Sequence, residues 1–412
     1  MLFFPDKLNE VPNGILLEPQ LVTNATCGKL KTSVVTERFA DHDEFQTINA
    51  GLTLPNNKIG SMINRFEILT DKTARPHADR IIFCDGTGGK IFDPDNDLEL
   101  SHWRPNRTPA EYRAGTSTEI CFRFLDNPIP GDWTVAVNNH VDVDGILSVY
   151  VLVYSEEAQR QRKTIIEAAE IGDFWGWGEL PAQRLFQGIT RLMRKDDTPR
   201  NVYEEAFRRI PDLIEGTDPE TADIEASLTP LSRGVQSVES GQIVRREVSK
   251  RFTQYIIPAS LVESDQQAAY IPGFNEVVSE KAIQWPQVRA RWDAERVCLV
   301  STERPSGWFH DLHFPGYLWA DTEGPWTPLG IDYRDSMSSY VISDVALIAA
   351  VQSLQERDSA DGQWALGGTS LPFGKELQEQ FPVVCRFVND DGEAEASGLS
   401  PDVVVNAFKV CW

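Results

Sequence analysis

The stretch Val135-Ala-Val-Asn-Asn-His-Val-Asp-Val-Asp-Gly-Ile-Leu-Ser148 decides the fold. It opens with an apolar run typical of a buried strand, and after its glycine a second apolar run predicts a helix over residues 146–153. His140, Asp142 and Asp144 stand between the two runs, at alternate positions. Because side chains alternate along an extended backbone, these three point in related directions. Imidazole and carboxylate groups together are a donor set for Mn²⁺ or Mg²⁺, so the stretch predicts a metal site at a strand end.

A simpler interpretation gives the same side chains local roles. Asp142 and Asp144 then act as turn and cap residues before the helix, and His140 packs nearby. Asp144 in particular stands where a helix cap is expected. We favour the metal site because three donor side chains gather at one strand end.

A second candidate ligand is Asp173, in Ala168-Ala-Glu-Ile-Gly-Asp-Phe-Trp-Gly-Trp-Gly178. The pattern predicts a helix that ends at Gly172, which would make Asp173 a turn residue. Alternatively, its carboxylate binds or bridges metal ions beside the aromatic side chains that follow.

Two more candidate site residues come from earlier segments. Asp85 leaves a short apolar strand at residues 80–84, and ligands of α/β sheets bind at such strand ends. His102 lies in a loop from which it can complete a coordination sphere. Its alternative role is that of a polar loop residue stacked on Trp103.

The order of apolar patterns predicts two folded parts. Strands and helices alternate from residue 80 to 170, which predicts an α/β domain with a mostly parallel sheet. We therefore divide the chain into an appended N-terminal segment (1–75), a metal-binding α/β domain (76–235) and a C-terminal α+β lobe (236–412). The expected strands are 80–84, 133–138, 242–245, 252–257 and 297–300, and the expected helices are 116–125, 146–153, 185–193, 207–213 and 344–355.

Composition narrows the class of protein. The chain has 412 residues, 41% of them hydrophobic, and a formal net charge of −23. It has no apolar run long enough to span a membrane and no signal peptide, and its six cysteines are scattered, so a reducing cytoplasm is expected. The negative charge opposes general binding to nucleic acid or to an anionic membrane. It still permits an anionic substrate, because bound cations invert the local field. Oligomeric state cannot be inferred from these features.

The segment Thr116-Ser-Thr-Glu119 fits a capping box at the start of the helix that follows. This explains both Thr116 and Glu119 without a catalytic role. The amides exposed at the same helix terminus are then free to receive a phosphate group.

The motifs resemble those of the DHH phosphoesterase superfamily. The segment 140–148 is similar to its first motif, H/N-x-D-x-D-G/A-x-x-S, and the segment 168–173 to its later A-x-x-G-D motif. The segment 82–85, followed by 116–119, resembles its strand–Asp and S-S/T-x-E spacing. The tripeptide DHH is absent, with Asp85-Gly-Thr87 in its place, and the first motif here follows the others, which implies a permuted or remote relative. The segments 100–103, 116–120 and 139–145 together also resemble an uncharacterised bacterial family known only as a domain of unknown function.

The resemblance implies a metal-dependent hydrolase, phosphoesterase-like, with two Mn²⁺ (or Mg²⁺) ions that activate water. It implies that His140 and Asp142 bind one ion, that Asp144 and Asp85 bind the other, and that Asp173 bridges them or completes the site. The expected substrate is small and anionic or phosphorylated.

Catalytic roles follow for His102, as a ligand or as the acid that protonates the leaving group, and for Asp144. By analogy with the superfamily, the C-terminal lobe would form one wall of the cleft, with Arg304, Trp308 and His310 facing the substrate. The alternative is that Trp308 belongs to the lobe core and that His310, in an H-x-x-H pattern with His313, is structural.

Two other functions stay open. One is a non-catalytic protein that binds a nucleotide or peptide on a degenerate DHH-like fold. The other is a metal-dependent biosynthetic enzyme that acts on a non-phosphate substrate. Metal content separates the first of these from an enzyme, since tightly held ions favour catalysis.

Overall fold

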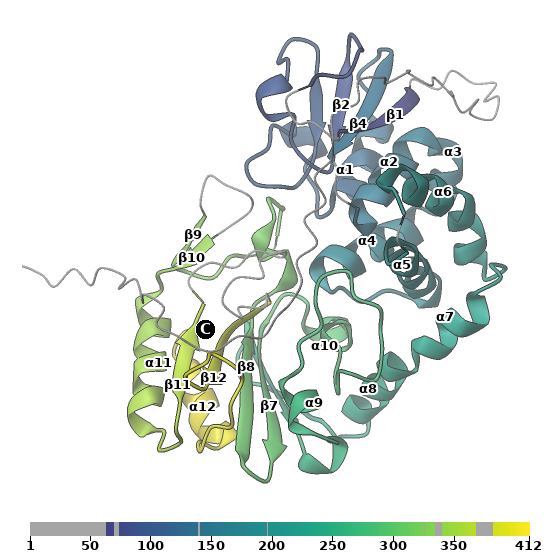
Figure 1. The fold of residues 1–412 in the computed structure, drawn as a ribbon. Helices are drawn as coiled ribbons and strands as arrows, with labels where there is room; N and C mark the ends of the chain where they lie inside the picture. Colours follow the sequence, from purple (N-terminus) through teal and green to yellow (C-terminus); the bar gives the residue numbers. More distant parts are fainter. Residues whose placement is uncertain are drawn as a thin grey trace, which may run out of the picture. The chain divides into compact units, whose positions relative to one another are not determined.

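The computed structural model describes residues 63–69, 74–138, 141–195, 197–324, 326–333, 340–367 and 382–412. All of them belong to one compact unit, Leu54–Trp412. Within this part of the chain, strands form a four-stranded sheet, a six-stranded sheet and a two-stranded ribbon (Figure 1). The fold is therefore mixed α/β, which confirms the predicted class at this level.

The four-stranded sheet is parallel throughout. Its order is β1 (Ile63–Leu69), β4 (Trp133–Asn138), β2 (Ile81–Cys84) and β3 (Leu98–Leu100). Because the strands run the same way, their carboxyl ends meet at one edge. β1 pairs with β4, so the sheet begins before residue 76 and the predicted boundary there is misplaced. The rest of the predicted appended segment, 1–62 and 70–73, lies outside the described residues.

Helices pack against this sheet and against one another (Figure 1). They are α1 (Ser117–Asp126), α2 (Val143–Val153), α3 (Ser155–Arg160), α4 (Arg162–Phe174), α5 (Leu180–Met193), α6 (Pro199–Glu215), α7 (Thr221–Ser227) and α8 (Thr229–Glu239). Every residue of α2 is buried, including the polar Asp144 and Ser148, and most of its sequence is apolar. It begins at Val143 rather than at the predicted residue 146, since Asp142 caps it.

The C-terminal half is built on the six-stranded sheet, in the order β11-β12-β8-β7-β6-β5. Its strands are β5 (Val244–Glu247), β6 (Phe252–Ile257), β7 (Val297–Arg304), β8 (Gly307–His313), β11 (Gln363–Leu366) and β12 (Val383–Val388). β6 and β7 are parallel and the other pairs are antiparallel, so the sheet is mixed.

Smaller elements complete this half. They are α9 (Asp265–Ala269), α10 (Pro286–Asp293), β9 (Ile331–Tyr333), β10 (Tyr340–Ile342), α11 (Val345–Arg357) and α12 (Pro401–Phe408). Core residues of α11 and α12, such as Leu354 and Phe408, pack in one apolar cluster with strand residues such as Phe387. None of the helices in the described part of the chain is both long and apolar enough to cross a membrane.

Candidate metal centre

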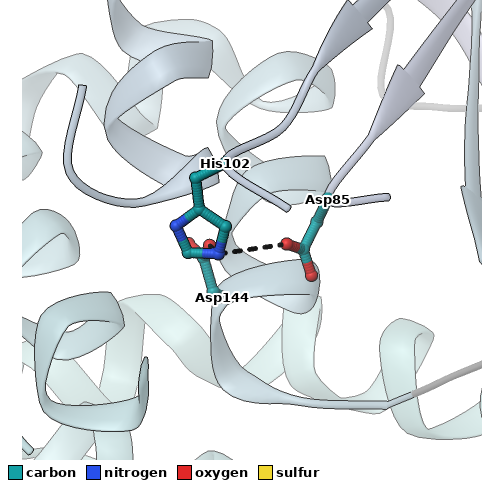
Figure 2. Close-up of side chains that lie close together, drawn as sticks. All are labelled: Asp85, His102 and Asp144. Atoms are coloured by element: carbon teal, nitrogen blue, oxygen red, sulfur yellow. Dashed lines mark ion pairs between the residues drawn. The ribbon is translucent and has the colours of Figure 1, made fainter. Parts of the chain in front are cut away.

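Side chains from three strand ends meet at the carboxyl edge of the parallel sheet. Asp85 directly follows β2, His102 follows β3, and Asp142 lies beyond β4 at the start of α2. Asp144 comes from the first turn of α2. Figure 2 shows the His102 imidazole beside the carboxylates of Asp85 and Asp144, and one ligand atom from each of the three lies within 4.8 Å of the other two.

His102 is fixed so that one ring nitrogen faces the carboxylates. Its Nδ1 lies 2.9 Å from the carbonyl oxygen of Gly115, which can only accept, so Nδ1 carries a proton. Its Nε2 lies 3.1 Å from Asp173 Oδ2, 3.7 Å from Asp144 Oδ2 and 3.9 Å from Asp85 Oδ1. Burial lowers the pKa of His102, but the contact with Asp173 and the three negative charges outweigh burial and raise it to about 10.

Asp85 is buried and held by neighbouring donors. Its Oδ1 accepts hydrogen bonds from Ser117 Oγ at 2.9 Å and from Trp103 Nε1 at 3.1 Å. Its φ of 45° is in the left-handed region, which is uncommon for a residue with a Cβ. Such backbone persists where the surroundings over-determine it, and it is concentrated at functional sites.

Asp144 binds the N-terminus of a neighbouring helix. Its Oδ2 accepts from the Ser117 amide at 2.8 Å and its Oδ1 from the Thr118 amide at 2.9 Å. Burial and the charge of Asp85 nevertheless raise the pKa of Asp144. Thr116 caps α1 as predicted, but the amides expected to be free for a phosphate already bind Asp144. An internal carboxylate is the anion at this helix terminus.

Asp142 is both a helix cap and one of four buried carboxylates, Asp85, Asp142, Asp144 and Asp173, that we call the acidic cluster. Its Oδ1 accepts from the Gly145 amide at 2.7 Å. A Cβ on Gly145 would lie 2.9 Å from Asp142 Oδ1, 2.9 Å from Asp85 Oδ2 and 3.0 Å from Tyr203 Oη. The second oxygen of Asp85, the carboxylate of Asp142 and a tyrosine hydroxyl therefore converge where Gly145 has no side chain.

Asp173 joins the cluster from the last turn of α4. It is 2% exposed, and its Oδ1 has no hydrogen-bond partner among the residues that the structure describes. Burial and the charges of Asp144 and Asp142 raise its pKa well above the ordinary value, although His102 opposes this shift. Asp173 thus offers an oxygen that a bound cation would satisfy.

The predicted helix end at Gly172 is wrong. α4 runs through Asp173 to Phe174, and Trp175 follows in the left-handed region with φ 51°. A Cβ on Gly172 would come within 3.1 Å of Val143 Cβ, so Gly172 serves close packing against α2 rather than termination.

The C-terminal half covers one side of the site, but with residues other than those that the sequence analysis named. The Trp319 ring meets the His102 ring edge to face at 4.9 Å, and Trp319 Nε1 donates to the Asp173 carbonyl at 3.0 Å. The Asp321 amide donates to the His102 carbonyl at 2.7 Å. A Cβ on Gly316 would lie 2.1 Å from the Phe174 carbonyl oxygen, so glycine permits this approach. The segment Gly316–Asp321 covers one side of the site.

Tyr203, in α6, is a second residue beside the cluster that was not predicted as a site residue. It is fully buried, and its hydroxyl has no hydrogen-bond partner among the described residues. Burial and the charges of Asp142 and Asp85 raise its pKa well above the ordinary value. Tyr203 stands four residues before Phe207, at helical spacing, so the sequence signal indicates only a core position.

The predicted site residues of the C-terminal half lie away from this cluster, and one further predicted ligand cannot be placed. His140 lies outside the described residues. Arg304, predicted to face substrate, instead bonds Asp265 Oδ1 through Nε at 2.6 Å, and Trp308 exchanges backbone hydrogen bonds with Ser397. Both lie where β7 turns into β8. The opposite end of β8, at His313, is roughly 15 Å away and leads to the segment Gly316–Asp321.

Both ring nitrogens of His310 are engaged within the C-terminal half, as the structural alternative for this residue expects. Its Nδ1 lies 2.9 Å from Ser301 Oγ and its Nε2 lies 3.0 Å from the Leu399 carbonyl. It is buried, and its ring stacks on Trp364 at 5.7 Å. His310 and His313 are three residues apart in β8, so the two imidazoles of the H-x-x-H pattern point to opposite faces of the sheet.

His310 is expected to make stability fall in weak acid. Burial lowers its pKa from 6.5 to about 4, so the unfolded chain takes up a proton at a higher pH than the folded chain does. The free energy of unfolding should therefore fall as pH drops from 6.5 toward 4, by about 2 kcal/mol from this residue between pH 8 and pH 5.

Urea unfolding of the wild type and of His310→Gln at both pH values measures this contribution. The variant should be less stable at pH 8 but should lose less stability on acidification. Equal losses in the two proteins would show that His310 is not buried in its neutral form.

Comparisons with known proteins find one family. Residues 69–251 match the model of a family of unknown function, DUF6687. No curated protein and no solved structure matches the chain. The matched residues include every residue of the acidic cluster, His102 and Tyr203, but not the covering segment Gly316–Asp321.

Proposed function

We propose that the chain is a metal-dependent hydrolase, phosphoesterase-like, with Mn²⁺ or Mg²⁺ at the acidic cluster. The observation that carries the proposal is a cluster of buried side chains: Asp85, Asp144 and Asp173 lie within 4 Å of His102 Nε2, and Asp142 adjoins Asp85 at the Gly145 position. Buried carboxylates at this density repel one another unless a cation neutralises them.

The donors favour a hard cation. They are carboxylate oxygens and one imidazole, which suit Mn²⁺ and Mg²⁺. The nearby Cys84 is no ligand in this proposal, because burial raises the pKa of its thiol well above the ordinary value and its Sγ contacts Cys121 Sγ at 3.7 Å. His102 donates Nδ1–H to a backbone carbonyl, the second contact that metal-binding histidines commonly make, so we assign Nε2 as a ligand rather than as the acid.

The cluster has two groups of donors, which suits two ions. His102, Asp144 and Asp173 form one group, and Asp142 belongs to the other. Asp85 faces both, with Oδ1 3.9 Å from His102 Nε2 and Oδ2 at the Gly145 position beside Asp142. We therefore assign the bridging role to Asp85, in place of the bridge expected at Asp173.

Bound ions would lower the pKa of water and neutralise charge on a phosphoryl group. The chain's own residues would do the rest. Tyr203 can donate its hydroxyl proton in a hydrogen bond to substrate, and Trp319 excludes water from the His102 side. A remote DHH-like relationship is part of the proposal, supported by the parallel sheet and by ligands at its strand ends.

Metal analysis followed by an activity panel tests this function. The purified chain should retain two Mn²⁺ per molecule after desalting, and it should hydrolyse at least one phosphodiester or nucleotide in a panel. Chelation should abolish the hydrolysis and Mn²⁺ should restore it. Glu111→Gln removes an exposed carboxylate of the same domain. As the control, it should change neither the retained Mn²⁺ nor the hydrolysis. A chain that retains no Mn²⁺ would overturn the proposal.

A further inference from the structure

A buried arginine in the C-terminal half has no carboxylate partner among the residues that the structure describes. Arg289, in α10, is 6% exposed. Its guanidinium contacts Gln284 Oε1 at 3.3 Å and His313 Nδ1 at 3.1 Å, and within the described ranges it forms no ion pair. A buried charge without a partner of opposite charge is strongly unfavourable.

The carboxylates nearby are already paired with other arginines. Asp311 Oδ1 lies 3.1 Å from Arg386 Nη2. Arg245 donates to Asp293 through Nη2 at 2.7 Å and through Nε at 2.8 Å. Arg289 is therefore the excess positive charge of the group. The burial that removes it from water also lowers its pKa.

Arg289 borders two small cavities. One has a volume of about 30 Å³, and its walls include Gln284, Asp311 and His313. The other holds about 40 Å³ and shares Arg289 and His313. Gln284 Nε2 is buried there and has no hydrogen-bond partner among the described residues. The first cavity has room for about two water molecules, or for one carboxylate group.

We propose that Arg289, Gln284 and His313 form a binding site for a singly charged oxyanion the size of a carboxylate group. Arg289 supplies a planar pair of N–H donors and Gln284 an unused amide donor. With Asp311 held by Arg386, the group has one net positive charge, which matches a monoanion. None of these residues belongs to the metal centre, so the site does not depend on the proposed hydrolase function.

Anion-dependent thermal stability of the full chain tests the site. Acetate should raise the melting temperature in a saturable way, relative to chloride at equal ionic strength. Inorganic phosphate, as a second arm, distinguishes a general oxyanion site from one selective for carboxylates. Arg289→Met should weaken the fitted acetate affinity at least about tenfold, because it removes the charge and its donors. Arg233→Met removes an exposed arginine and should leave the affinity unchanged.

A second variant has the opposite expected sign. Asp311→Asn removes a carboxylate that borders the first cavity and frees Arg386, so acetate affinity should rise several-fold. This variant keeps the test valid if Arg289→Met does not fold. The proposal is overturned if the wild type shows no saturable shift with either anion, if Arg289→Met keeps the shift, or if Asp311→Asn weakens binding. Arg289→Met should retain the wild-type metal content, so failure of the metal proposal would be seen separately.

Discussion

Asp142→Asn is expected to abolish tight metal binding while leaving the fold intact. Asparagine caps a helix about as well as aspartate, so the hydrogen bond from the Gly145 amide survives in the variant. Only the negative charge is lost. Since even outer partners of metal ligands cost 10- to 100-fold, a lost ligand should weaken Mn²⁺ binding at least about 100-fold. The unfolding free energy of the metal-free protein should change by less than about 1 kcal/mol.

A matched control exists elsewhere in the chain. Asp344 caps α11 in the same manner, accepting from the amides of Ala346 and Leu347, and lies outside the acidic cluster. Asp344→Asn should change stability as little and leave Mn²⁺ binding unchanged. Titration calorimetry with Mn²⁺ and urea unfolding of chelated protein separate the two effects. If Asp142→Asn binds Mn²⁺ as tightly as the wild type, Asp142 is only a cap.

Much of the α/β domain was predictable because its signals are local. The strands at 80–84 and 133–138 and the helix at 116–125 follow from apolar runs and a capping box, and the structure contains all three. Parallel strands then bring Asp85 and Asp142 to one edge by a general rule of such sheets. The pattern therefore predicted donors from separate segments at a common edge.

Other site features depend on tertiary packing that leaves no local signal. Tyr203 and Trp319 reach the cluster from α6 and from the C-terminal half, and each stands in the sequence as an ordinary aromatic residue. Asp144 caps α1 from α2, although the capping box of α1 looked complete by itself. α4 passes through Gly172 because contact with α2 outweighs the poor helix propensity of glycine.

Arg304 and His310 lie away from the acidic cluster for a different reason. Their expected role came from an analogy between whole domains. Such an analogy does not predict which residues of a strand face the site. In the sheet, Arg304 is at the hairpin end and His310 points to the face of Trp364. Because side chains alternate along a strand, the sequence alone could have predicted that His310 and His313 point to opposite faces of the sheet.

Gly145→Ala is expected to damage the site more than the fold. The new Cβ would lie 2.9 Å from oxygens of Asp142 and Asp85 and 3.0 Å from the Tyr203 hydroxyl, closer than such contacts normally allow. All three atoms are ends of side chains, which can move without disturbing the backbone. Alanine also favours the helix by about 1 kcal/mol relative to glycine, so the unfolding free energy should change little.

The displaced oxygens are those that we assign to the metal ions, and a shift of about 1 Å at such a site can cost 100-fold in rate. Mn²⁺ affinity and hydrolysis should therefore fall at least about 100-fold in Gly145→Ala. Gly273→Ala is the matched control, because its nearest contact would be Glu276 Oε2 at 3.6 Å. If Gly145→Ala keeps wild-type Mn²⁺ affinity and is no less stable, the carboxylates can part at no cost. Their approach around Gly145 would then not be the arrangement that holds the ions.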